Sequence, residues 1–209
     1  VFITQTNKML FKKENNKIGN YLISYIYICS LPAIVLILFN NFILEILIDQ
    51  RYHGSENVII ILSIYYFSLI FLKISGTQLM YSKKVWLNTK LFILNVVLNL
   101  ILNIPFIYFF GIIGAALATL IASSISLFFS LYYAKKFAPI LYDKKKILCI
   151  FGFIFLSTVY SISINEKLIN FDLIKNLIIS SIIVVSFLIY GYLSQIYNKS
   201  DIKEILKFK

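Results

Sequence analysis

Apolar residues occupy this chain in long runs that short clusters of charged residues separate. The six runs are Tyr21–Phe39, Val58–Tyr81, Leu91–Phe110, Ile112–Ala134, Ile147–Ile164 and Asn176–Tyr197. A helix needs about 20 apolar residues to cross a bilayer core of roughly 30 Å. None of the runs has the two-residue alternation of a barrel strand, and within lipid only helices or closed barrels satisfy the backbone. The pattern therefore predicts an all-α integral membrane protein with six transmembrane helices.

Composition supports the same class. Hydrophobic residues make up 60% of the chain and charged residues 14%, whereas soluble domains are about 45–50% apolar and about 25% charged. The two cysteines, Cys29 and Cys149, lie in different runs, and we interpret them as buried thiols rather than a disulfide or metal site. The single histidine, His53, stands isolated beside Arg51 and Glu56, which argues against a metal or general-base role. We expect no cofactor and no metal.

The lysines predict how the helices are oriented. They gather before the first run, between the second and third, between the fourth and fifth, and after the sixth. These lysines are Lys8, Lys12, Lys13, Lys17, Lys83, Lys84, Lys90, Lys135, Lys136, Lys144, Lys145, Lys146, Lys199, Lys203, Lys207 and Lys209. The other junctions hold only Arg51, Lys167 and Lys175 as basic residues. Because cytoplasmic loops retain positive charge, both ends of the chain are expected in the cytoplasm and the protein in the inner membrane.

The net charge of +11 follows from this topology. Anionic membrane lipids are the partner that such lysines favour. A nucleic-acid footprint would need a basic soluble domain, and the chain has none. Membrane lipids rather than nucleic acid are therefore expected around the basic loops.

The stretch "NIPFIYFFGIIGAALATLIASS", residues 103–124, is unusually rich in small side chains. Small residues recur at steps of three or four, at Gly111, Ala115, Ala118 and Ala122, with Gly114 and Ala118 as a second pair. Such a helical face lets a second helix approach closely within lipid. Pro105 is expected to end or bend the preceding run just before a tight turn, which glycine permits. The stretch predicts a helical hairpin with a close-packed second arm.

The segment "LNVVLNLILNIPFIYFFGIIGAALATLIA" resembles part of the polysaccharide transporter family, the O-antigen and capsule flippases. That part reads as an Asn-rich helix, Leu or Ile before Pro, then aromatic-Gly-Ile-x-Gly-Ala-Ala-x-Ala-Thr. Upstream, "FILEILIDQRYHGSENVIIIL" resembles the short external element of the family, although Asp49 and Gln50 precede Arg51 and Tyr52 where the family usually has a glycine. The resemblance implies the multidrug, oligosaccharidyl-lipid and polysaccharide exporter superfamily.

On this template the six runs correspond to helices nine to fourteen of a fourteen-helix exporter. Residues 1–20 resemble the end of a preceding helix followed by a cytoplasmic connector, so we expect that the chain begins within a longer protein. Residues 21–134 would then be the four-helix part of the C-terminal lobe, residues 135–197 two additional helices, and residues 198–209 a cytoplasmic tail. The implied partners are the N-terminal lobe of the same protein and a lipid-linked oligosaccharide of the undecaprenyl-diphosphate type.

Lys73 is a charge inside the second run, on the face that helical spacing gives to Tyr66 and Thr77. A charge at the bilayer centre costs about 2.5–3.5 kcal/mol on insertion scales, so a retained one suggests function. One hypothesis places the ammonium in a water-filled cavity, where it attracts the diphosphate of the lipid-linked sugar. The other is that Lys73 extends to the inner headgroups, which its four-carbon stem can reach if the helix ends early, near Gly76.

Amides form a stripe on the third run. Asn95, Asn99 and Asn103 recur at steps of four, and Asn88 lies about two turns earlier on roughly the same side. Amides are costly to bury in lipid without partners, so they are expected to face the bundle interior. They either line a path for the sugar or join the third and fourth runs. A second stripe favours a packing seam on the fourth run: Thr119, Ser123, Ser126 and Ser130.

Three functions compete at this point. The resemblance implies a transporter, not an enzyme, that flips or exports a lipid-linked oligosaccharide or polysaccharide precursor by alternating access. A cation-coupled multidrug exporter would need an acidic residue within the helices, and no Asp or Glu lies deep in any run. A membrane glycan polymerase or acyltransferase would need grouped acids and histidines near a membrane face, whereas His53 is isolated. The sequence therefore favours the polysaccharide transporter.

Overall fold

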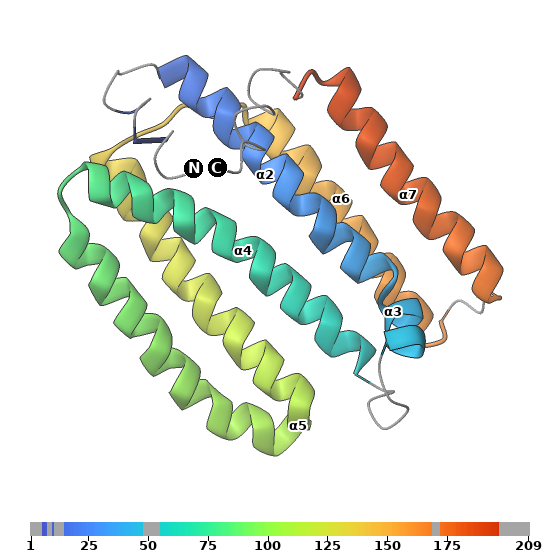
Figure 1. Cartoon of the computed structure of the whole chain (residues 1–209). Helices are drawn as coiled ribbons and strands as arrows, with labels where there is room; N and C mark the ends of the chain where they lie inside the picture. Colours follow the sequence, from blue (N-terminus) through green and yellow to red (C-terminus); the bar gives the residue numbers. More distant parts are fainter. Residues whose placement is uncertain (1–5, 8–9, 11–14, 48–54, 169–171, 197–209) are drawn as a thin grey trace.

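The computed structural model describes residues 6–7, 10, 15–47, 55–168 and 172–196. All regular secondary structure within these residues is helical, which confirms the all-α prediction. The helices lie side by side with their long axes roughly aligned (Figure 1). They are α2 (Asn15–Leu38), α3 (Asn40–Leu47), α4 (Glu56–Tyr81), α5 (Val85–Phe137), α6 (Lys144–Asn165) and α7 (Leu173–Leu193).

Five of these helices, α2, α4, α5, α6 and α7, are long and apolar enough to cross a membrane by length and composition. The chain is therefore consistent with a multi-pass membrane protein. Several sequence features lie outside the described residues: the opening stretch from Val1, Lys8, Lys12, Lys13, the Asp49–His53 segment, and the tail from Tyr197 with its lysines.

Helix α5 consists of two antiparallel arms that meet at Gly111. Gly111 has φ 58° and ψ −135°, a left-handed conformation that favours glycine. Ser126 Oγ donates to the Leu91 carbonyl at 2.9 Å, and Asn99 Nδ2 donates to Thr119 Oγ1 at 3.0 Å, so residues on opposite sides of the reversal face each other. We call residues 85–110 the first arm and residues 112–137 the second arm. The six predicted runs are thus six helical segments.

Two expectations about this hairpin need correction. Gly111 does not share the small-residue face with Ala115, because it is itself the reversal and has non-helical angles. Of the two outcomes expected at Pro105, an end of the helix is ruled out, because the helix continues from Pro105 to Phe110. A proline inside a helix removes one backbone hydrogen bond, and the helix tolerates that loss here. Glycine, not proline, reverses the chain.

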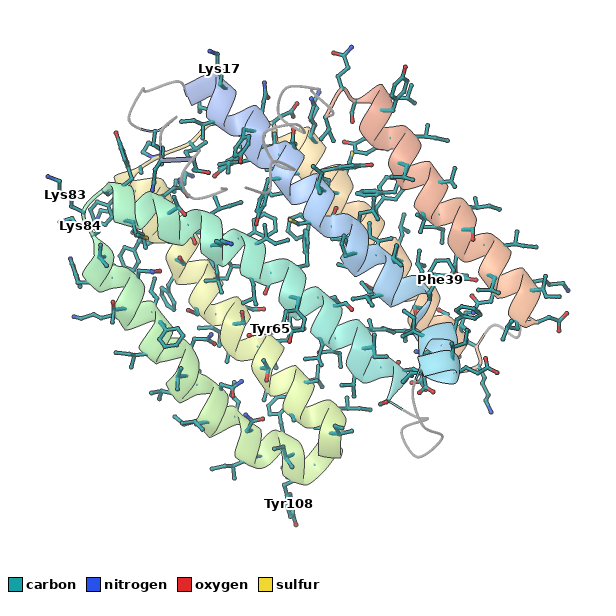
Figure 2. The ribbon with its side chains drawn as sticks, in the orientation of Figure 1. Lys17, Phe39, Tyr65, Lys83, Lys84 and Tyr108 are labelled. Carbon is teal, nitrogen blue, oxygen red and sulfur yellow. The ribbon has the colours of Figure 1, made fainter. Side chains whose placement is uncertain are left out.

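Apart from Lys73, each described lysine lies near one end of the bundle or the other. Gln78 Nε2 donates to the Ala138 carbonyl at 2.7 Å, which joins the end of α4 to the end of the second arm. We call this the lysine-rich end, and Figure 2 shows Lys17, Lys83 and Lys84 there, with Phe39 and Tyr108 toward the other end. Its lysines are Lys17, Lys83, Lys84, Lys90, Lys135, Lys136, Lys144, Lys145 and Lys146.

At the opposite end Asn57 Nδ2 donates to Glu166 Oε1 at 3.1 Å, which joins the start of α4 to the residue after α6. The described lysines near this end are Lys167 and Lys175. Consecutive helical segments therefore run in alternating directions, and the lysine clusters that are far apart in sequence come together. This spatial separation is what the alternating pattern predicts.

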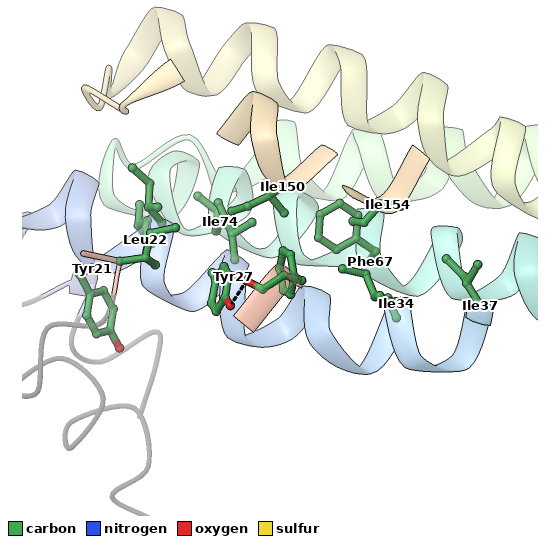
Figure 3. Close-up of a cluster of buried hydrophobic side chains, with 14 of the residues drawn as sticks. Tyr21, Leu22, Tyr27, Ile34, Ile37, Phe67, Ile74, Ile150 and Ile154 are labelled. Atoms are coloured by element: carbon green, nitrogen blue, oxygen red, sulfur yellow. Dashed lines mark hydrogen bonds between the residues drawn. The ribbon is translucent and has the colours of Figure 1, made fainter. Parts of the chain in front are cut away.

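Helix α2 lies at the centre of the larger core (Figure 3). Its buried residues Ile34 and Ile37 belong to the same cluster as Phe67 of α4 and Ile150 of α6. Tyr27 stacks on Phe187 of α7 with ring centroids 4.4 Å apart and donates from Oη to the Phe187 carbonyl at 2.8 Å. The missing side chain of Gly191 leaves room for the Tyr27 ring. Burial of these large apolar groups holds α6 and α7 against α2.

A second, smaller cluster joins α4 to the hairpin. It comprises Leu79 of α4 with Leu87 and Leu91 of the first arm. Helix α4 thus packs against α2 on one side and against α5 on the other. Helix α4 therefore forms one side of the space between itself and the hairpin, where the candidate site lies.

Candidate functional site

A polar pocket of about 480 Å³ lies between α4 and the two arms of α5. Its lining residues come from three helical segments that the fold brings together. They are Tyr65, Leu69, Leu72 and Lys73 of α4, Asn88, Thr89, Leu91, Phe92 and Asn95 of the first arm, and Ser126 and Ser130 of the second arm. We call it the α4–α5 pocket. Its polar groups are one ammonium, two carboxamides and three aliphatic hydroxyls. Its aromatic rings are those of Tyr65 and Phe92.

Lys73 supplies the positive charge of this pocket. It lies eight residues before the end of α4 at Tyr81, which is about 12 Å along a helix. The helix continues through the buried Gly76, so the early helix end on which extension to the headgroups depended is absent. The Lys73 carbonyl accepts from Thr77 Oγ1 at 2.9 Å, within an intact helical backbone. Lys73 therefore lies on a continuous helix at the edge of the pocket, and its side chain is exposed.

The two residues predicted to share the helical face of Lys73, Tyr66 and Thr77, do not line the pocket. Tyr66 is 63% exposed and does not line the pocket. Thr77 is buried and bonds to the backbone of its own helix instead. Tyr65, which the helical spacing from Lys73 did not select, lines the pocket between α4 and α5 (Figure 2).

The reason lies in how the lining residues are spread around α4. Tyr65, Leu69 and Leu72 form a narrow stripe, and Lys73 stands at its edge. At 3.6 residues per turn, Tyr66 lies about 20° beyond that edge. Lys73 lines the pocket edge and is itself exposed, whereas Tyr66 is 63% exposed and lies outside the pocket lining. A stripe at 65, 69 and 72 is visible in the sequence, but only the position of the hairpin shows that it faces a pocket.

The asparagine stripe of the first arm divides into two parts. Asn88 and Asn95 line the pocket. Asn103 Nδ2 donates to Asn99 Oδ1 at 2.8 Å, and Asn99 in turn donates to Thr119 of the second arm. The two interpretations of the stripe thus apply to different residues: Asn99 and Asn103 join the arms, whereas the carboxamides of Asn88 and Asn95 face the cavity.

Serines connect the second arm to its neighbours. Ser75 and Ser130 oxygens lie 2.6 Å apart, and Ser68 and Ser123 oxygens lie 3.5 Å apart. Ser126 Oγ is committed to the Leu91 carbonyl. Ser126 and Ser130 therefore form the floor of the pocket as part of a hydrogen-bonded seam, which fixes the pocket's shape.

Small residues allow this close packing of the second arm. Every fourth residue is small and buried along one face: Gly114, Ala118, Ala122, Ser126, Ser130 and Ala134. Ala115 lies beside this face and is half-buried, with its carbonyl accepting from Thr119. A Cβ on Gly114 would overlap the backbone of Phe106, so the arms meet backbone to backbone near the reversal. This is the geometry in which small residues strengthen helix association in lipid.

The cysteines and acids do not line the pocket. Cys29 and Cys149 are free thiols, and Cys149 is exposed on α6 rather than buried as expected. Within the described residues there is no group of three or more His, Cys, Asp or Glu that could hold a metal. His53 lies outside the described residues. The polar chemistry that the described residues bring together is thus that of the α4–α5 pocket.

Comparison of the chain with protein-family models, curated proteins and solved structures gives no match. The fold nevertheless defines a class: an all-helical chain whose long apolar helices suit a multi-pass membrane protein, with a polar pocket between two of them. The pocket is the feature of the protein that bears on its function.

Proposed function

We propose that the protein is a transporter that translocates a lipid-linked oligosaccharide or polysaccharide precursor across the cytoplasmic membrane. The observation that carries this proposal is the α4–α5 pocket, whose lining combines Lys73, Asn88 and Asn95 between apolar helices. Polar groups are costly at membrane depth and are retained where they serve a substrate path. The hairpin sequence resembles that of polysaccharide flippases, although no family model matches the chain.

The chemistry of the pocket suits a sugar linked to a diphosphate. The ammonium of Lys73 attracts phosphate charge, and this attraction is strong where water is scarce. The amides of Asn88 and Asn95 donate and accept hydrogen bonds, as sugar hydroxyls require. A volume of about 480 Å³ lies within the roughly 300–1,000 Å³ range of ligand sites. The pocket accommodates a headgroup and leaves the polyprenyl chain in lipid.

The position of the pocket supports loading from one side of the membrane. Asn88 lies three residues after the start of the first arm, and Ser130 lies seven residues before the end of the second arm. The pocket is therefore closer to the lysine-rich end, which we place in the cytoplasm because cytoplasmic loops retain lysine. A cytoplasmic precursor would pass Asn88 before it meets Lys73. Rocking between inward-facing and outward-facing states would then carry the headgroup across.

A cation-coupled multidrug exporter is the second candidate. It would need a carboxylate in the pocket to bind a proton or sodium. The pocket lining contains no carboxylate. The carboxylates of the described residues 55–168 and 172–196 lie at the ends of the long helices: Glu56, Asp143, Glu166 and Asp172. The pocket as described therefore favours an anionic substrate.

Replacing Lys73 tests the proposal. Lys73→Ala should lower export of lipid-linked glycan by about tenfold or more, because hydrogen bonds to charged groups contribute about 1.5–3 kcal/mol. Lys73→Arg should retain part of the export. Lys145→Ala removes the same charge outside the pocket and should leave export unchanged. Export by Lys73→Ala equal to that of Lys145→Ala, at equal amounts of protein in the membrane, would remove the pocket from the transport path.

A further inference from the structure

Five lysines gather where α4 meets the base of the hairpin. The end of α4, the start of the first arm and the end of the second arm come together there, and Gln78 Nε2 bonds to the Ala138 carbonyl across them. We call these lysines the hairpin-base cluster. Its members are Lys83, Lys84, Lys90, Lys135 and Lys136.

Aromatic rings hold three of these ammonium groups. Lys84 Nζ lies 5.4 Å and Lys136 Nζ 5.8 Å from the centre of the Phe137 ring. Lys90 Nζ lies 4.8 Å from the centre of the Trp86 ring. Each distance is within the range of a cation–π interaction. The Phe137 ring therefore brings two like charges from different segments of the chain together, and the Trp86 ring holds a third on the first arm.

No carboxylate of the described residues forms an ion pair with this cluster. Elsewhere lysines lie next to acids: Lys175 pairs with Asp172 at 3.7 Å. Lys144 and Lys145 directly follow Asp143, whose carboxylate accepts from the Lys145 backbone N–H. Two ammonium groups on one ring repel each other, and an anion between them would remove that repulsion. Within the described residues, the hairpin-base cluster therefore has no carboxylate that offsets its charge.

We propose that the hairpin-base cluster binds the headgroup of an anionic phospholipid. A lipid is favoured over a free anion because the surface beside the cluster is apolar. Trp86 is 53% exposed, as tryptophan is at a membrane interface. One exposed face of the first arm continues from there at helical spacing, through Trp86, Lys90, Ile93, Val97 and Leu100. The headgroup would lie at Lys84, Lys90 and Lys136, and an acyl chain along Ile93 and Val97.

This inference needs the helices to lie in a membrane, but it does not depend on what the protein transports. A paired variant tests it. Lys84→Gln/Lys136→Gln removes both ammonium groups on Phe137, and Lys144→Gln/Lys145→Gln removes the same charge from the same end of the bundle. Binding of phosphatidylglycerol and phosphatidylcholine to the purified protein in detergent would be measured by native mass spectrometry, with thermal melting to show that both variants fold.

The first variant should bind phosphatidylglycerol about tenfold or more weakly, because each lysine near the surface adds to the attraction of anionic lipid. The second should lose less than about twofold, and Lys84→Arg/Lys136→Arg should bind like the unaltered protein. Equal loss in both glutamine variants would overturn the site, since charge alone would explain binding. Equal binding of phosphatidylcholine, or displacement of the lipid by soluble glycerol phosphate at matched concentration, would also overturn it.

Discussion

Gly114 lies so close to Phe106 that a methyl group on its Cα would overlap the Phe106 carbonyl. This contact joins the two arms of α5 just inside the reversal at Gly111. The same second arm carries Ser126 and Ser130 into the α4–α5 pocket. The geometry of the candidate site therefore depends on how closely the arms approach, and this dependence leads to the first prediction.

Gly114→Ala should destabilise the protein by about 1–3 kcal/mol, the usual cost of inserting a methyl group into a well-packed contact. Gly152→Ala is the matched control, because nothing lies within 4 Å of a Cβ at Gly152. That control should be neutral or stabilising by up to about 1 kcal/mol, since alanine is the better helix former. Thermal unfolding in detergent, followed by circular dichroism, measures both. Equal melting temperatures for the two variants would contradict the backbone contact.

Docking of α7 gives a second prediction. Tyr27→Phe keeps the ring stacked on Phe187 but removes the hydrogen bond to the Phe187 carbonyl, so stability should fall by about 0.5–1.5 kcal/mol. Tyr192→Phe removes a hydroxyl from an exposed ring and should change nothing. Gly191→Ala should cost more than Tyr27→Phe, because its methyl would displace the Tyr27 ring. If Tyr27→Phe melts like Tyr192→Phe, the hydrogen bond does not hold α7.

The divided asparagine stripe gives a third prediction. Asn99→Ala should lower stability by about 1 kcal/mol, because it breaks the bond to Thr119, and export should persist. Asn95→Ala should lower export while melting is unchanged, because the side chain faces the pocket. Melting temperature and glycan export, measured on both variants, separate the two roles. The same phenotype for both would show that the stripe acts as one unit.

Orientation in the membrane is the subject of a fourth prediction. In a protein with Cys29 and Cys149 replaced by alanine, Tyr108→Cys should react with a membrane-impermeant maleimide in intact cells, since Tyr108 is 82% exposed near the reversal. Lys83→Cys at the lysine-rich end should react only after permeabilisation. The opposite labelling pattern would contradict the assignment of that end to the cytoplasm.

The sequence predicts the helices well because the length of an apolar run and the conformational freedom of glycine are local properties. The runs ending at Tyr81 and Phe110 correspond closely to α4 and the first arm. Helix α2 begins at Asn15, six residues before its apolar run, because a helix continues through polar residues beyond the membrane core. The reversal could be predicted because Gly111 lies among bulky residues, and glycine adopts such a backbone conformation most readily.

Which residues line the pocket is less predictable, because that depends on where a neighbouring helix lies. Tyr65 and Tyr66 are adjacent residues of the same type, yet Tyr65 lines the pocket between α4 and α5 and Tyr66 does not. Asn95 and Asn99 differ because Thr119 lies opposite one of them. The short helix α3, whose Asn40 Nδ2 donates to Ser161 of α6 at 2.9 Å, has no span-length pattern that predicts it.

Translocation measured in vesicles is the most direct test of the proposed transport. Purified protein would be reconstituted with a fluorescent polyprenyl-diphosphate oligosaccharide, and its transfer between leaflets followed by protection from a membrane-impermeant quencher. We predict that the protein accelerates transfer, that Lys73→Ala slows it by about tenfold or more, and that Lys145→Ala has no effect. Transfer no faster than in protein-free vesicles would contradict the proposed function, and acceleration unaffected by Lys73→Ala would contradict the role of the α4–α5 pocket.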